Sequence, residues 1–179
     1  FDENVKMTKK VVEMAHACDI PVEAELGQIG KMGDSDEPGV ALNRVKESMA
    51  VPEEAVKFVE LTEIDFLAAA VGTIHGCRTP FAKLDIPRIE KIRELTGVPL
   101  VLHGASGAND EEITKGIAAG ICKINIDTRI KMQFTEKIRE MIKTNPQEID
   151  PRKILGPAKE SAKEIIRDRI KIFGSSGKA

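Results

Sequence analysis

The sequence has few cysteines and no long apolar run. Its three cysteines, Cys18, Cys77 and Cys122, are too scattered for a disulfide framework or a CxxC metal site. We expect them to pack in the core of a protein of the reducing cytoplasm. No apolar stretch approaches the roughly 20 residues of a bilayer span, and Phe1 opens into charged, helix-like sequence rather than a signal peptide. We therefore expect no membrane partner.

The chain also lacks an excess of either charge. It has 27 Lys and Arg residues against 29 Asp and Glu residues, a net charge of −2, so nothing in the composition indicates a nucleic-acid partner. A length of 179 residues with 41% hydrophobic residues suits one soluble globular domain with a sizeable core.

Helix-like and strand-like stretches alternate along the chain. Hydrophobic periodicity and Pro or Gly boundaries predict helices over 4–18, 52–62, 86–96, 110–119, 129–143 and 157–173, and strands over 21–26, 66–73, 99–102 and 121–126. Four strand–helix units in a row indicate an α/β fold with parallel strands and right-handed crossovers, in a doubly wound sheet or a barrel. A (β/α)₈ TIM barrel needs eight such units, and this chain supplies about four, followed by C-terminal helices.

Polar residues gather at or near the C-terminal ends of the predicted strands, the face on which barrel enzymes build their sites. They are Glu23, Glu25, His75, His103, Asn125 and Asp127. This distribution favours the barrel over the doubly wound sheet.

Two histidines, His75 in GTIHG and His103 in VLHGASG, follow apolar strands in the same way. Imidazole suits Zn²⁺, and a catalytic zinc keeps three protein ligands and one open position. A lone histidine at a strand end is more often a hydrogen-bonded loop residue, but two at matching ends strengthen the metal interpretation. The third histidine, His16, is predicted to be a packing residue of the first helix.

Two acidic residues alternate with apolar ones in the first predicted strand. Glu23 and Glu25 therefore project to one side of the strand. One interpretation places both carboxylates in the barrel interior near a metal. The alternative is a buried ion pair with a lysine.

Small residues follow the third and fourth strands in the segments 104–107 and 125–128. Loops of this kind leave backbone N–H groups free to meet phosphate oxygens, although glycines also serve simple tight turns. Histidine ligands beside a phosphate loop indicate metal-assisted chemistry on a sugar phosphate.

Four motifs in this order, VEAELGQIG, GTIHG, LVLHGASG and KINIDT, closely resemble those of the class II, zinc-dependent fructose-1,6-bisphosphate aldolases and their tagatose-bisphosphate relatives. The likeness runs from Phe1 to the C-terminal FGSSGKA. It implies that the first strand here is the fifth of eight, so that residues 1–179 are the C-terminal part of a single TIM-barrel domain.

The resemblance implies a role for each matching position. His75 and His103 match zinc ligands, and Glu25 matches a glutamate at or near the metal. The positions that match substrate or phosphate contacts are Gly76, Gly104, Ser106, Asn125, Asp127 and Thr128. The resemblance also implies that zinc acts as a Lewis acid toward the dihydroxyacetone-phosphate portion of the substrate, so that no Schiff-base lysine is required. A monovalent cation is a further expected activator.

The sequence departs from the family pattern at several places. The third zinc histidine and the acid–base aspartate belong to an earlier strand that this chain does not contain, so we expect the isolated chain to be inactive. Thr79 replaces a lysine found in many members, and Arg78 beside it is a candidate phosphate ligand or a solvated loop residue. Lys131 stands where bisphosphate-specific members often have an arginine. In the loop after the first strand, Lys31 and Met32 replace the smaller or acidic residues expected from the family pattern.

The expected reaction is cleavage of fructose 1,6-bisphosphate to dihydroxyacetone phosphate and glyceraldehyde 3-phosphate. The alternatives are a tagatose-1,6-bisphosphate aldolase and a non-catalytic sugar-phosphate-binding or scaffold protein. The expected partners are a small sugar bisphosphate and further copies of the chain in a dimer or tetramer.

Overall fold

A computed structural model of the protein describes residues 1–31, 45–77 and 79–178. It divides into two compact units, Phe1–Asn125 and Ile126–Ala179. Arg78 and Met32, about which the sequence makes predictions, lie outside the described residues. Among the residues described, no helix is both long enough and apolar enough to cross a bilayer.

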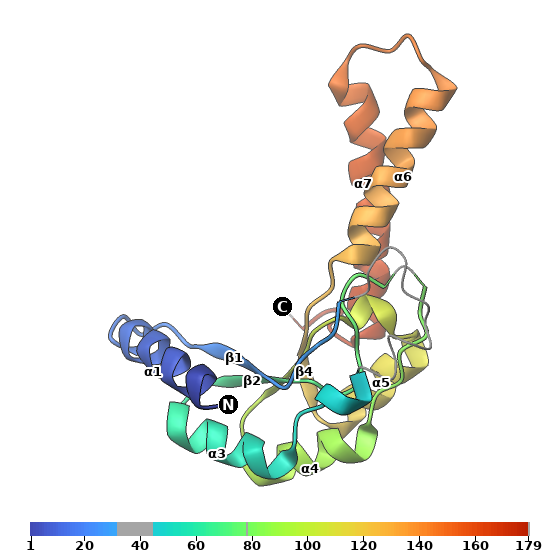
Figure 1. The fold of residues 1–179 in the computed structure, drawn as a ribbon. Coiled ribbons are helices and arrows are strands. Elements are labelled where there is room, and N and C mark those ends of the chain that lie inside the picture. Colours follow the sequence, from blue (N-terminus) through green and yellow to red (C-terminus); the bar gives the residue numbers. More distant parts are fainter. Residues whose placement is uncertain (32–44, 78, 179) are drawn as a thin grey trace. The chain divides into compact units, whose positions relative to one another are not determined.

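The first unit contains a four-stranded sheet and the helices that connect its strands (Figure 1). The helices are α1 (Asp2–His16), α3 (Pro52–Thr62), α4 (Ile86–Thr96) and α5 (Asp110–Ala119). The strands are β1 (Glu23–Leu26), β2 (Phe66–Ala69), β3 (Leu100–Leu102) and β4 (Ile121–Ile124). The predicted bounds of α3, α4 and α5 are confirmed, whereas the strands are shorter than predicted.

Local capping explains why these helices begin and end where they do. The side chain of Asp85 accepts a hydrogen bond from the backbone N–H of Arg88 at the start of α4, and α4 ends at Gly97 with φ +68°. Asn109 accepts in the same way at the start of α5. Because these signals are local, the sequence alone was enough to predict both helices.

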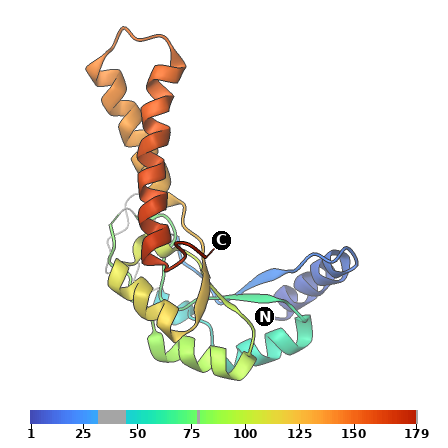
Figure 2. The ribbon, with the colours of Figure 1, turned by 180° about the vertical axis from the view of Figure 1, so that it is seen from behind.

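All four strands are parallel, in the order β1-β2-β3-β4. Figures 1 and 2 show α3, α4 and α5 following one another along the sheet. A doubly wound sheet reverses its strand order at a switch point, whereas strands added one after another are the pattern of a barrel. The predicted parallel βα arrangement is therefore confirmed in its barrel form.

The pairing register assigns residues to the two faces of the sheet. Leu67 pairs with Leu100 and Leu100 with Ile121, and all three are nearly inaccessible to solvent. Ile121 approaches Gly116 of α5, so this face packs against the helices. Glu25 pairs with Ala68, the residue after Leu67 in β2. Because successive side chains of a strand point to opposite faces, Glu25 belongs to the face opposite that of Leu67.

An irregularity between β3 and β4 changes which side chains of β4 reach that opposite face. Leu100 pairs with Ile121, but the next residue, Val101, pairs with Lys123, so Cys122 is the additional residue of a bulge. Without it, Lys123 would pair with Leu102 and lie on the helix-covered face. The bulge therefore places Lys123 on the same face as Glu25.

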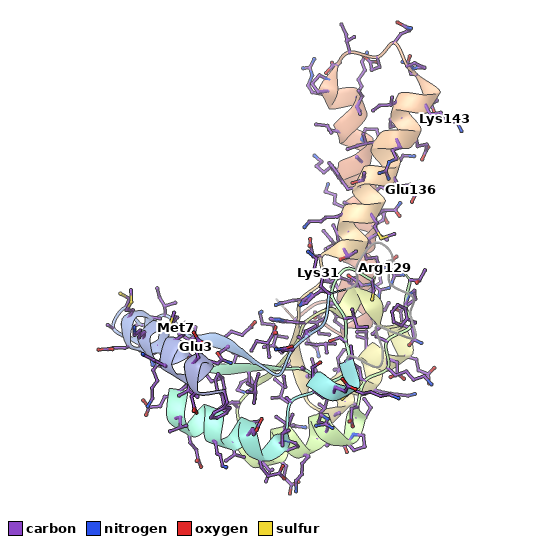
Figure 3. All side chains as sticks on the ribbon, in the orientation of Figure 1. Glu3, Met7, Lys31, Arg129, Glu136 and Lys143 are labelled. Carbon is purple, nitrogen blue, oxygen red and sulfur yellow. The ribbon has the colours of Figure 1, made fainter. Side chains whose placement is uncertain are left out.

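The second unit is a hairpin of two helices, α6 (Thr128–Thr144) and α7 (Pro151–Ile172), which lie side by side in both views (Figures 1 and 2). Gln133 Nε2 donates a hydrogen bond to Ser161 Oγ at 2.7 Å between them. Figure 3 shows the side chains of Glu136 and Lys143 on α6.

The predicted start of the last helix at Pro157 was wrong. The helix begins at Pro151, where the preceding Asp150 accepts a hydrogen bond from the backbone N–H of Arg152, and Pro157 lies inside the helix. Two prolines were available, and the one preceded by a capping aspartate begins the helix.

The periodicity of this helix predicts that Ile165, Ile166 and Ile170 face inward, and this prediction is partly wrong. Ile166 and Ile170 are each 41% exposed, whereas Ile165 is half-buried. The buried stripe instead includes Ala158, which has no exposed surface, and the half-buried Ser161. Small residues allow the two helices to approach closely, and this turns the larger isoleucines toward solvent.

Candidate metal centre and active site

Three side chains from three neighbouring strands form a cluster suited to a metal ion. Glu25 lies in β1, His75 follows β2, and His103 follows β3 directly. One ligand atom from each lies within 4.8 Å of the others, and the two imidazole rings are 6.0 Å apart between centroids. The predicted meeting of these residues at one end of the sheet is confirmed.

Backbone contacts hold the loop that carries His75. The N–H of His75 donates to the carbonyl of Gly30 at 2.8 Å, and His75 forms an isolated parallel bridge with Lys31, whose side chain is labelled in Figure 3. The segment that follows β1 therefore supports His75 through main-chain hydrogen bonding.

Gly104 brings the two His-Gly loops together. Its φ is +64°, and a Cβ at this position would lie 3.0 Å from the carbonyl carbon and 3.1 Å from the oxygen of Ile74. Any other residue would be strained and would push this backbone away. Because Ile74 precedes His75 and Gly104 follows His103, the glycine allows the two histidines to be neighbours.

His103 is held by a carboxylate at each ring nitrogen. Its Nδ1 lies 2.8 Å from Oε2 of Glu25 and its Nε2 lies 2.8 Å from Oε1 of Glu23. The His103 side chain is only 19% exposed, so these contacts fix the ring in one orientation. The sequence placed both glutamates on one side of the strand, and the structure confirms this.

Lys123 of β4 contacts Glu23, the carboxylate outside the metal cluster. Its Nζ donates to Oε2 of Glu23 at 2.7 Å and to Oδ1 of Asn125 at 2.8 Å. Burial alone would raise the pKa of the Glu23 carboxyl, but the hydrogen bonds with Lys123 and His103 outweigh it and hold that pKa below its ordinary value. Glu23 therefore forms the ion pair with a lysine that the alternative interpretation named, although the half-exposed Lys123 means that this pair is not buried, while Glu25 lies in the candidate metal cluster.

The donor chemistry of the cluster fits a zinc ion. Two imidazoles and one carboxylate are a ligand set that catalytic zinc sites use, and such sites leave one position open. The remaining carboxylate, Glu23, accepts from the ring of a ligand in the manner usual for outer-shell partners. The residues present therefore fit the metal that the sequence predicted.

The other predicted substrate residues fall into two groups. Near the cluster, Gly76 follows His75, Gly104 and Ser106 follow His103, and the N–H of Asn125 donates to the carbonyl of Leu102 at 2.9 Å. The second group, Asp127, Thr128 and Lys131, belongs to the helical unit. There the ammonium of Lys131 lies 2.6 Å from Oδ2 of Asp127, both side chains being exposed.

Two expectations about other residues were wrong. His16 is an exposed residue whose Nε2 lies 2.8 Å from Oδ2 of Asp65, because α1 ends at the surface. Cys18 and Cys122 are exposed, so core packing holds only for Cys77, where burial raises the pKa of the thiol.

Sequence reasoning missed Lys123 as a site residue. Lys123 lies two positions before Asn125, just as Glu23 lies two positions before Glu25, so each pair projects to one side of its strand. This spacing was the signal available in the sequence. The signal was insufficient because the bulge at Cys122 decides which face the alternating pair occupies.

Comparison with known proteins agrees with the motifs and the geometry. The family profile described as "Fructose-bisphosphate aldolase class-II" matches residues 1–178. The chain is 42% identical to a fructose-bisphosphate aldolase of Thermus caldophilus and 44% identical to one of Geobacillus stearothermophilus, covering all of this chain and 65% and 60% of those proteins. The chain thus spans less than two thirds of these relatives.

A solved structure supports the fold. The YdjI aldolase of Escherichia coli K12 superposes with a TM-score of 0.79 at 34% identity, over 99% of this chain and 57% of that one. The four βα units described above are part of a TIM barrel. With a profile that matches almost its whole length and relatives above 40% identity, the chain belongs to the class II fructose-bisphosphate aldolase family.

Proposed function

We propose that the intact protein is a metal-dependent aldolase that cleaves fructose 1,6-bisphosphate to dihydroxyacetone phosphate and glyceraldehyde 3-phosphate. The observation that carries this proposal is the cluster of Glu25, His75 and His103 at the C-terminal ends of three parallel strands, in a chain of this aldolase family. This is the face of a barrel where active sites are built.

We propose Zn²⁺ as the metal, with His75 and His103 as ligands and Glu25 as a nearby carboxylate. The bound ion supplies Lewis-acid chemistry, polarising a substrate carbonyl and stabilising the negative charge that develops as the carbon–carbon bond breaks. Glu25 holds the His103 ring through Nδ1 at 2.8 Å, which keeps this ligand oriented before the metal arrives. A monovalent cation is a further expected activator.

The loops beside the cluster support a phosphorylated substrate. Gly76, Gly104 and Ser106 are proposed to receive one phosphate through backbone N–H groups, which small residues leave accessible. Asn125 is proposed to hold a substrate hydroxyl close to the histidines.

The remaining substrate contacts are proposed from the sequence. Asp127 and Thr128 are assigned to the substrate, Lys131 to the second phosphate, and Arg78 to a phosphate in place of the missing lysine. Lys131 and Asp127 pair with each other in the structure, so a phosphate would compete with Asp127 for this ammonium.

We propose that residues 1–179 are the C-terminal part of a single barrel domain. In the described sheet, β1 and β4 each pair with one neighbouring strand only, whereas a closed barrel has no edge strand. We further propose a cytoplasmic homo-oligomer, a dimer or tetramer, as the native assembly.

Cleavage of fructose 1,6-bisphosphate by the purified intact protein, followed through coupled reduction of the triose phosphates, tests the function. We expect turnover that a chelator abolishes and added zinc restores. Parallel assays with tagatose 1,6-bisphosphate address the alternative aldolase, because a larger kcat/KM for that substrate would reassign the specificity. Absence of zinc-dependent cleavage of either sugar, with binding of sugar phosphate retained, would identify a binding or scaffold protein.

A further inference from the structure

We propose that Lys123 is a positioning residue for Asn125. It turns the side-chain amide of Asn125 so that the NH₂ group, and not the oxygen, is offered to the substrate. The inference rests on the proposed function and deepens it at one substrate contact. Lys123 thereby acts on the substrate through another side chain rather than by touching it.

The ammonium of Lys123 is shared between two side chains. Its Nζ donates to Oε2 of Glu23 at 2.7 Å and to Oδ1 of Asn125 at 2.8 Å. A lysine side chain ordinarily samples many rotamers, but the pair with Glu23, which is only 24% exposed, restricts this one. Glu23 is held in turn by His103 through its other oxygen. The anchored ammonium can therefore orient the amide beside it.

The chemistry of the two groups decides which atom of the Asn125 amide faces Lys123. An ammonium carries three N–H donors and no acceptor, whereas a primary amide has an accepting oxygen and a donating NH₂ group. Only the oxygen can therefore meet the ammonium at 2.8 Å. The NH₂ group is the other branch of the amide and points away from Lys123. Because hydrogen bonds in a chain polarise one another, the ammonium also strengthens these N–H donors.

The main chain holds Asn125 beside the metal cluster. Its backbone N–H donates to the carbonyl of Leu102 at 2.9 Å, and Leu102 directly precedes His103. Asn125 is exposed, and within residues 1–31, 45–77 and 79–178 no group accepts a hydrogen bond from its side-chain NH₂. Both N–H groups are therefore available to an oxygen of the substrate close to the histidines.

The bulge in β4 makes this arrangement possible. It pairs Lys123 with Val101, and Val101 lies two residues before His103, on the same face of β3. Because Lys123 and Asn125 are also two positions apart, the additional residue, Cys122, sets the face of both. One irregularity thus brings the orienting ammonium and the amide to the side of the sheet that carries the cluster.

A double-mutant cycle on the intact, zinc-loaded protein tests the inference. The variants are Lys123→Met, Asn125→Ala and the two combined, and the readouts are kcat and KM for fructose 1,6-bisphosphate, zinc content and the urea midpoint. Lys123→Arg tests rescue, because a guanidinium is also only a donor. Lys163→Met is the matched control, since this lysine is 47% exposed, against 48% for Lys123, and pairs with Glu160 on α7.

We expect Lys123→Met to lower kcat/KM by roughly 3- to 10-fold, as for one net hydrogen bond, with zinc content unchanged and a urea midpoint shifted no more than in Lys163→Met. Asn125→Ala should lower kcat/KM by about 100-fold or more. Adding Lys123→Met to that variant should change it by less than about twofold, because the lysine then has no amide to orient. Lys123→Arg should recover most of the loss, and Lys163→Met should show none.

Asn125→Asp tests the orientation itself and leaves Lys123 in place, so it decides the inference even if Lys123→Met does not fold. Its carboxylate keeps an oxygen for the ammonium but replaces the NH₂ donor by a second acceptor. Activity should therefore fall as far as in Asn125→Ala.

Three results would overturn the inference: retained turnover in Asn125→Asp, an equal effect of Lys123→Met with and without the Asn125 amide, or loss of zinc in Lys123→Met. Failure of the proposed function is distinguishable, because the unmodified, zinc-loaded protein then cleaves no fructose 1,6-bisphosphate. In that case the same cycle is read from the dissociation constants of dihydroxyacetone phosphate.

Discussion

Glu25 and His103 are 78 positions apart in the sequence, yet Oε2 of the first lies 2.8 Å from Nδ1 of the second. Glu25 lies in β1 and His103 directly follows β3, and β2 lies between these two strands. The contact therefore spans the intervening strand, and it makes the candidate metal cluster a product of the fold rather than of any one motif.

The first prediction concerns the ligands themselves. His75→Ala and His103→Ala in the intact protein should each weaken zinc binding by more than the roughly 10- to 100-fold cost of losing an outer-shell partner, and activity should fall with metal content. Metal analysis after dialysis and turnover assays provide the measurement. The control is His16→Ala, because this exposed histidine pairs with Asp65 outside the cluster. Unchanged zinc content in both ligand variants would contradict the assignment.

A second prediction isolates the close approach at Gly104. Gly104→Ala adds a Cβ 3.0 Å from the Ile74 carbonyl carbon, whereas at Gly97, which has a similar φ of +68°, nothing lies within 4 Å. Gly97→Ala should cost about 1–2 kcal/mol of unfolding free energy from its backbone conformation. Gly104→Ala should cost a further 1–3 kcal/mol, roughly, from overpacking, and should also weaken zinc binding. Urea unfolding measures the unfolding free energy of both variants. Equal losses of unfolding free energy would show that the close approach of Gly104 to Ile74 does not constrain the residue at position 104.

A third prediction concerns substrate choice by Asp127. A polar group left without its partner costs about 1–3 kcal/mol, so recognition of a hydroxyl by Asp127 would discriminate between epimers. Asp127→Ala should lose turnover of fructose 1,6-bisphosphate and narrow the preference over tagatose 1,6-bisphosphate. The ratio of the two kcat/KM values is the measurement, with Glu136→Ala in α6, the helix that Asp127 precedes, as the control (Figure 3). A ratio equal to that of the unmodified protein would show that Asp127 does not contribute to the choice between the two substrates.

The fourth prediction is a pH dependence of stability at the start of β1. Hydrogen bonds from His16 and from the backbone N–H of Val22 hold the pKa of Asp65 below its ordinary value of 3.8. A lowered native pKa stabilises the fold above the unfolded-state pKa, and this contribution disappears as the pH falls through the native value. Asp65→Asn should therefore be less stable than the unmodified protein at neutral pH.

The difference in urea midpoint between these two proteins should shrink at pH values well below 3.8. Asp168→Asn, at an exposed position of α7, is the control and should show no such trend. A constant difference for Asp65→Asn across this range would contradict the linkage.

A fifth prediction concerns residues 1–179 expressed alone. The open edges of β1 and β4 should pair with other chains, so light scattering should detect association rather than a compact monomer. Zinc-dependent cleavage should be absent, because the resemblance assigns the third zinc histidine and the acid–base aspartate to an earlier strand. Adding that part as a separate polypeptide tests complementation, and full activity from residues 1–179 alone would refute the half-barrel interpretation.

The sequence by itself determined the features that depend on short-range physics. Capping residues and 3.6-residue periodicity placed the helices at 52–62, 86–96 and 110–119, and alternation placed Glu23 and Glu25 on one side of their strand. The positions of His75 and His103 after apolar strands indicated a shared site, since parallel strands end at the same edge of a sheet. Four ordered motifs then supplied the family.

Only the tertiary structure decided the features that depend on pairing between distant segments. The bulge at Cys122 set the face of Lys123, and it arises from the register of β4 against β3, which no local pattern encodes. The exposure of Ile166 depended on how α7 packs against α6. The start of the last helix at Pro151 instead of Pro157 has a local cause, the capping side chain of Asp150, which the prediction did not use. Side-chain periodicity is a property of each segment, whereas register and packing are properties of its neighbours, and the environment of His103 required both.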